Sequence, residues 1–104
     1  PDLDSLWQCV MSEFDEFRAV TADTLLDEAE RKDRLEDEFG DILFASINLG
    51  RHFGVDGEVA LHRAVDKFTR RFQQMEAMAD KPLDTLSFED WDTLWNRAKQ
   101  KVKT

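Results

Sequence analysis

The sequence predicts an all-α fold, a bundle of helices. Three long segments, and a shorter one near the C-terminus, carry apolar side chains at the three- and four-residue steps of a helix face. Turn residues separate the later segments, and no segment is a convincing strand. At 104 residues the chain is long enough for one hydrophobic core and too short for two, so we expect a single domain over residues 1–104.

The first half of the chain contains two expected helices. Residues 1–20 form the first, with Asp2 or Asp4 as N-cap. Residues 21–33 are polar, and we expect a turn followed by a short or frayed helical piece. The strongest helix covers residues 34–53, where apolar side chains surround much of the circumference, as in a central helix.

The second half contains two more expected helices. Glycine-containing turns precede the third, which Asp56 would cap and which would end near Met78. Lys81-Pro82 breaks the chain, and residues 87–90 resemble a capping box that opens the last helix. The apolar stripe of this last helix contains Trp91, Leu94, Trp95, Ala98 and Val102.

The charge of the chain limits the classes of partner that it can bind. The net charge is −9, which argues against binding to nucleic-acid backbone or to an anionic membrane surface. Its distribution is uneven, because residues 1–41 hold fourteen acids and four bases, whereas residues 51–76 hold five bases and four acids. An acidic half is therefore followed by a locally basic segment.

The remaining composition indicates a cytoplasmic protein. A single cysteine, Cys9, excludes a disulfide framework and fits a reducing compartment, and its apolar helical surroundings predict a packed side chain. There is no apolar run long enough to cross a membrane and no signal-peptide pattern. The start at Pro1 suggests a fragment that lacks a segment upstream.

Two carboxylate pairs are the main functional signal. Residues three apart share a helix face, so Glu13 and Glu16 form one pair. Glu38 and Asp41 form the second pair, and the 21 residues between the pairs allow an antiparallel return that brings them together. An all-oxygen ligand set suits Mg²⁺ or Mn²⁺. The alternative is a solvated acidic surface, but Gly40 within the second pair indicates close approach by another backbone or a ligand.

A basic strip on the third helix indicates the substrate class. Lys67 and Arg71 lie one turn apart around Phe68, and we expect them to bind phosphate. For Arg63 and Arg70 we prefer solvated surface with salt bridges. Carboxylates that hold a divalent cation near such bases predict a polyphosphate substrate.

Five motifs follow one another over nearly the whole chain: Glu13-x-x-Glu16, Glu38-x-x-Asp41, residues 48–52 (NLGRH), residues 64–72 (AVDKFTRRF) and residues 91–95 (WDTLW). Together they resemble the C-terminal domain of the MazG family of nucleoside triphosphate pyrophosphohydrolases. The resemblance implies an all-α NTP pyrophosphatase fold completed by dimerisation, as a homodimer or a dimer of dimers. It implies Mg²⁺-dependent hydrolysis of NTP or dNTP to monophosphate and pyrophosphate, by water attack at the α-phosphorus, with Mn²⁺ as a possible substitute for Mg²⁺.

The resemblance also implies roles for single residues. The metal ligands and catalytic residues are four carboxylates: Glu13, Glu16, Glu38 and Asp41. Lys67 and Arg71 match triphosphate contacts. The resemblance assigns no residue to the nucleobase, and the candidates for that contact are Asn48, Trp95 or an aromatic residue upstream of this chain.

The chain departs from the family pattern at Val65, where relatives commonly have Asn, and at Ser12, where they often have an acid. An upstream helix is also expected to be missing. Two alternatives stay open: a phosphoribosyl-ATP pyrophosphohydrolase, and a catalytically weak helical interaction module that retains the fold.

Overall fold

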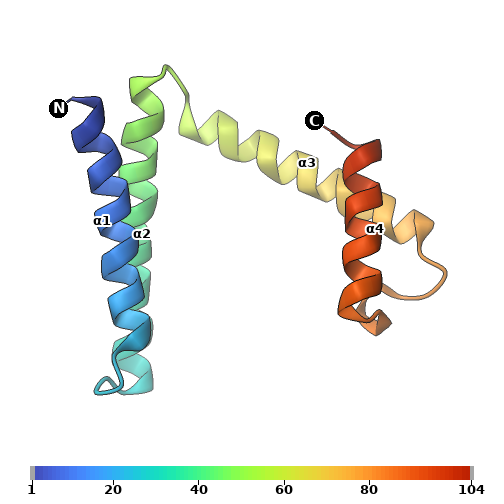
Figure 1. Ribbon diagram of the computed structural model, residues 1–104, viewed down its shortest axis with the longest axis horizontal. Helices are drawn as coiled ribbons and strands as arrows, with labels where there is room; N and C mark the ends of the chain where they lie inside the picture. Colours follow the sequence, from blue (N-terminus) through green and yellow to red (C-terminus); the bar gives the residue numbers. More distant parts are fainter. Residues whose placement is uncertain (1, 104) are drawn as a thin grey trace. The chain divides into compact units, whose positions relative to one another are not determined.

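The computed structural model describes residues 2–103, which form four α-helices and one 3-10 turn and contain no strand (Figure 1). The helices are α1 (Leu3–Ala22), α2 (Glu28–His52), α3 (Gly57–Met78) and α4 (Phe88–Lys101), with the 3-10 turn η1 at Leu83–Thr85. The predicted all-α class is therefore confirmed. The chain divides into two compact units, residues 1–57 and residues 58–104, and each is described by itself.

The first unit is an antiparallel hairpin of α1 and α2 (Figure 1). Asp2 is the N-cap of α1, because its carboxylate accepts a hydrogen bond of 2.8 Å from the Ser5 amide. The predicted cap at Asp2 is therefore confirmed, and the helix runs from Leu3 to Ala22, two residues beyond the predicted end. In the connecting turn the Arg31 guanidinium donates to the Asp23 carbonyl and ties the start of α2 to the end of α1.

The start of α2 corrects one sequence prediction. Residues 28–33 were expected as a short or frayed piece ahead of a helix beginning at Arg34, but they are the first turns of α2 itself. The cause is Asp27, whose carboxylate accepts a 2.8 Å hydrogen bond from the Glu30 amide and so caps the helix. Glu28 and Glu30 then place negative charge at the positive end of the helix dipole.

The hairpin has a thin core. Val20, Ile42 and Ala45 are buried, and the rings of Phe17 and Phe39 meet edge to face at 5.7 Å. Seven large apolar side chains of α1 and α2 are 46–68% exposed: Trp7, Met11, Phe14, Phe39, Leu43, Phe44 and Ile47. Cys9 is exposed as well, so the expectation that it packs is wrong for the single chain. The apolar pattern of these helices exceeds what one hairpin can bury.

The second unit packs α3 and α4 around Met75 and Ala98, both fully buried. Ser87 caps α4 by accepting a 3.1 Å hydrogen bond from the Asp90 amide, which confirms the predicted capping signal. An aromatic cluster links the two helices and consists of Phe68, Phe72, Trp91 and Trp95. Among residues 2–103 no helix combines the length and the apolar character that a bilayer crossing requires.

Candidate functional site

The hairpin gathers carboxylates from both of its helices. Glu13 of α1 and Glu38 and Asp41 of α2 each offer an oxygen, and these three oxygens lie within 4.8 Å of one another. The antiparallel return of the chain brings Glu13 of the first sequence pair beside both members of the second pair. Glu13 and Glu38 are half-buried, and Asp41 is exposed. The structure therefore brings together three of the four residues expected to bind metal.

Glu16 lies outside this group of three, although it is close enough to act on it. Burial raises the pKa of Glu13, a hydrogen bond with the Glu16 side chain raises it further, and the charges of Glu16, Asp41 and Glu38 act in the same direction. All four carboxylates thus contribute to one electrostatic cluster. Its mutual repulsion favours either a proton or a cation among the oxygens.

Two carboxylate oxygen atoms of the cluster lack a hydrogen-bond partner within residues 2–103. Glu13 Oε2 and Glu38 Oε2 are buried and have no hydrogen-bond partner among the described residues. A buried carboxylate oxygen without a partner is costly, and a bound cation removes the cost. The donors are all carboxylate oxygens, which suit a hard divalent cation such as Mg²⁺ or Mn²⁺. The residues present therefore fit a divalent metal.

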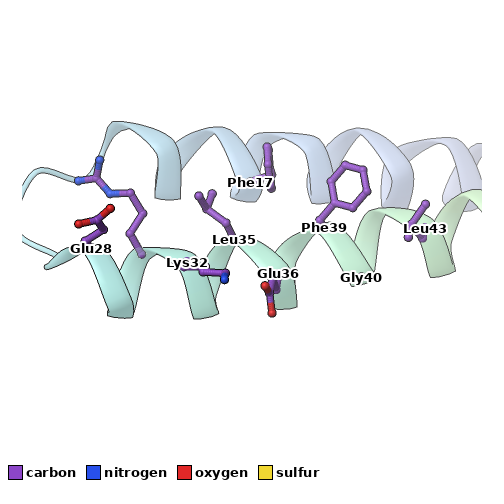
Figure 2. A pocket seen from close by; sticks show the side chains of 9 residues that line it. Phe17, Glu28, Lys32, Leu35, Glu36, Phe39, Gly40 and Leu43 are labelled. Carbon is purple, nitrogen blue, oxygen red and sulfur yellow. The ribbon is translucent and has the colours of Figure 1, made fainter.

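Gly40 lies beside an open groove on the hairpin. A Cβ atom built at Gly40 would have no neighbour within 4 Å, so no other part of the hairpin approaches it closely. The groove, about 650 Å³ in volume, runs along α2 past Phe17, Leu35, Phe39 and Leu43, with Lys32 and Glu36 at its edge. Figure 2 shows Gly40 on α2 between Glu36 and Leu43. Any close approach at Gly40 would come from outside the hairpin.

The predicted phosphate ligands lie in the second unit and have different surroundings. Lys67 is half-buried, with its nitrogen 5.4 Å from the centre of the Phe68 ring. Arg71 is only 8% exposed, and its Nε donates a 2.9 Å hydrogen bond to the Val102 carbonyl. Its guanidinium also lies over the rings of Phe68 and Trp95. Phosphate binding by Arg71 stays a prediction. The structure shows in addition that Arg71 holds the Val102 carbonyl and packs on the aromatic rings of its own unit.

The other basic residues of α3 follow the expectation in part. Arg70 forms a 3.1 Å salt bridge with Asp66, one turn earlier, which confirms the preferred interpretation of Arg70 as salt-bridged surface. Arg63 is exposed and makes no such bridge among the described residues.

The two candidate nucleobase contacts also lie in different units. Asn48 lines a cavity of about 410 Å³ together with Leu6, Arg51 and His52. The sequence motif at residues 48–52 already contains Asn48, Arg51 and His52, whose spacing of three and four residues puts them on one helix face, but it assigned no role to Arg51 or His52. Trp95 stacks on Phe68 with parallel rings whose centres are 5.4 Å apart.

The class that the fold and the site define is an all-α domain whose helical hairpin carries a candidate site for a divalent cation. Residues 2–95 match the MazG nucleotide pyrophosphohydrolase domain. The chain belongs to this family, and the resemblance noted from its motifs is confirmed.

Three relatives show the extent of the similarity. Over 77 residues the chain is 44% identical to the nucleoside triphosphate pyrophosphohydrolase/pyrophosphatase MazG of Thermotoga maritima, covering 71% of this chain and 30% of the relative. Over 94 residues it is 35% identical to the nucleoside triphosphate pyrophosphohydrolase of Escherichia coli strain K12, covering 88% and 34%. Over 76 residues it is 45% identical to the uncharacterized protein YabN of Bacillus subtilis, covering 70% and 16%. The matched region therefore spans about a third or less of each relative.

Proposed function

We propose that this chain hydrolyses nucleoside triphosphates, NTP or dNTP, to the monophosphate and pyrophosphate. The observation that carries the proposal is the carboxylate cluster of the hairpin, with its two buried oxygen atoms that lack a partner. Membership of the MazG family and the names of the Thermotoga and Escherichia relatives support the same reaction.

The proposed roles follow the position and chemistry of each side chain. Four carboxylates would hold Mg²⁺, with Mn²⁺ as a substitute: Glu13, Glu16, Glu38 and Asp41. When bound, the cation would neutralise phosphate charge and activate water. Water attack at the α-phosphorus forms a new P–O bond, breaks the bond to the oxygen that leads to the β-phosphate, and releases pyrophosphate.

Substrate binding is assigned to four further residues. Lys67 and Arg71 would contact the triphosphate, because an ammonium and a guanidinium both donate charge-assisted hydrogen bonds to phosphate oxygens. Asn48 and Trp95 are proposed to contact the nucleobase, since an amide can bond to a base edge and an indole can stack on its face.

The proposed assembly is a homodimer or a dimer of dimers. Its support is the exposed apolar surface of α1 and α2, because single-chain proteins rarely leave a large contiguous apolar surface in water. We also propose a cytoplasmic location, which fits the single free thiol of Cys9.

The deciding experiment measures pyrophosphate release from each NTP and dNTP with Mg²⁺, for the wild-type chain and for Glu38→Gln. We expect pyrophosphate release from at least one nucleotide. Glu38→Gln should lower the rate of release by about 100-fold or more, because loss of a residue that only supports a metal ligand already lowers metal affinity or activity by about 10–100-fold. Asp33→Asn, which removes the same charge at an exposed position of α2, should keep full activity.

Two outcomes would contradict the proposal. Faster turnover of phosphoribosyl-ATP than of any NTP would assign the chain to the related pyrophosphohydrolase. A folded chain without any turnover, whose melting temperature Mg²⁺ does not raise, would indicate an interaction module.

A further inference from the structure

The cavity at the end of α2 has lining residues to which the proposed function gives no role. It is about 410 Å³ in volume, and it is lined by Leu6 of α1 and by Asn48, Arg51 and His52 of α2. The leucine forms an apolar wall, the asparagine amide offers both donors and an acceptor, and the guanidinium offers a fork of N–H donors. Such a combination of apolar surface and directional polar groups is typical of pockets that bind small molecules.

This cavity and the carboxylate cluster lie on the same hairpin and on the same face of α2. Both belong to the unit of residues 1–57. Asn48 follows Asp41 by close to two helical turns, so the two side chains share a face and lie about 10 Å apart along the helix axis. Ala45, between them on that face, carries only a methyl group. An extended ligand held at the cluster can therefore reach the cavity along α2.

The Arg51 side chain is not needed to complete the end of its own helix. The Gly50 carbonyl accepts hydrogen bonds from the Phe53 and Val55 amides, and the Arg51 carbonyl accepts one from the Gly54 amide. The turn after α2 thus satisfies these last carbonyls with backbone donors. The Arg51 side chain is exposed and forms no salt bridge within residues 2–103. Its guanidinium is therefore available to a ligand in the cavity.

We propose that this cavity binds the nucleobase of the substrate and that Arg51 selects guanine. Guanine presents two adjacent acceptors, O6 and N7, which match the parallel N–H groups of a guanidinium, whereas adenine presents a donor, its N6 amino group, beside N7. The apolar wall of Leu6 and the neutral amide of Asn48 fit a base better than they fit a phosphate, which gains nothing from an apolar surface. The inference rests on the proposed function and deepens it by naming the base.

The first test compares kcat/KM for GTP and ATP. The wild type should prefer GTP by about fivefold or more, and Arg51→Ala should remove the preference. ITP should react like GTP because its base keeps O6 and N7, whereas 7-deaza-GTP, in which carbon replaces N7, should lose most of the preference. Arg34→Ala is the matched control, since it removes the same charge from an exposed position of α2 outside the cavity, and it should keep the preference.

Arg51→Lys separates reading of the base from attraction by charge. It keeps the positive charge and loses the planar fork, so it should lose the preference for GTP as Arg51→Ala does. If Arg51→Ala instead lowers kcat/KM by the same factor for every nucleotide, Arg51 contacts phosphate and the assignment to the base is overturned. Equal kcat/KM of the wild type for GTP and ATP would overturn it as well.

A binding measurement distinguishes failure of this site from failure of the proposed function. The α,β-methylene analogues of GTP and ATP carry carbon in place of the oxygen that leads to the β-phosphate, so calorimetry with Mg²⁺ measures their affinity without turnover. The GTP analogue should bind the wild type about fivefold or more tightly than the ATP analogue, and Arg51→Ala should bind both equally. If the chain hydrolyses nucleotides but the wild type binds both analogues equally, the site is overturned and the function stands. If the GTP analogue binds more tightly and no nucleotide is hydrolysed, the site stands and the function fails.

Discussion

Glu13 makes the carboxylate cluster sensitive to pH. Its pKa is raised in the folded chain by burial and by Glu16, Asp41 and Glu38. Between about pH 4.3, the ordinary glutamate value, and this raised pKa, the folded state binds more protons than the unfolded state. The stability contributed by this group is therefore present at low pH and is lost as the pH rises through that window.

The measurement is a series of thermal melts of the metal-free chain from acidic to neutral pH. Glu13→Gln should flatten the decline that the wild type shows over the window. At neutral pH, Mg²⁺ at about 100 times its Kd should stabilise the wild type by about 2.7 kcal/mol, or roughly 10 °C or more in Tm. A variant that follows the wild-type pH profile would contradict the assignment of the effect to Glu13.

At Gly40 the structure predicts whether a substitution raises or lowers the free energy of unfolding. Nothing lies within 4 Å of a Cβ at this position in the interior of α2, so Gly40→Ala should increase the free energy of unfolding by about 1 kcal/mol. Urea unfolding at dilute protein concentration measures it. Gly54→Ala is the opposite control, because its φ of 74° lies in the left-handed region and should cost about 1 kcal/mol. Destabilisation by Gly40→Ala would show that another group already occupies the groove.

For single residues, the sequence predicted the positions of the carboxylates better than it predicted the surroundings of the basic side chains. Helical spacing and the length of the connection were sufficient to place Glu13, Glu38 and Asp41 together, because both are local properties of the chain. The surroundings of Arg71 could not be predicted, because its partner is a backbone carbonyl 31 residues away. The spacing of side chains along α3 does not show which backbone carbonyl near the end of α4 will lie beside Arg71.

Among the secondary-structure elements, α2 shows how a cap can outweigh local polarity. The predicted start at Arg34 was too late because residues 28–33 lack apolar periodicity, while the Asp27 side chain stabilises the first turn by hydrogen bonding. The four helices and the break at Lys81-Pro82 were predictable, since apolar spacing and proline act over a few residues. The 3-10 turn at Leu83–Thr85 had no such signal.

Removal of the Asp27 cap tests this explanation. Asp27→Ala should destabilise the chain by about 1 kcal/mol and increase amide hydrogen exchange in the first turn of α2, because the Glu30 amide loses its acceptor. Asp33→Ala, at an exposed position within the same helix, should change stability by less than about 0.5 kcal/mol. Equal effects of the two variants would leave the early start of α2 without a cause.

For the whole molecule, the exposed apolar surface of the hairpin predicts self-association. Phe44 is 68% exposed on α2, and a charge there would have to be desolvated in any interface. Phe44→Lys should therefore sediment as a monomer with unchanged helical content, whereas the wild type should sediment as a dimer or larger. Leu25→Lys, at a 93% exposed position in the turn between α1 and α2, should assemble like the wild type. A monomeric wild type would contradict the proposed assembly.

The aromatic cluster of the second unit has a spectroscopic consequence. The indoles of Trp91 and Trp95 are stacked 5.6 Å apart, at an angle of 17°, whereas Trp7, the third tryptophan of the chain, is 48% exposed on α1. Two stacked indoles couple electronically and give a near-ultraviolet circular dichroism signal that an isolated, solvated indole lacks. That signal reports the formation of α4, because Trp91 and Trp95 lie one turn apart on this helix. The amide bands report all four helices, so the folding of α4 can be followed separately without any label.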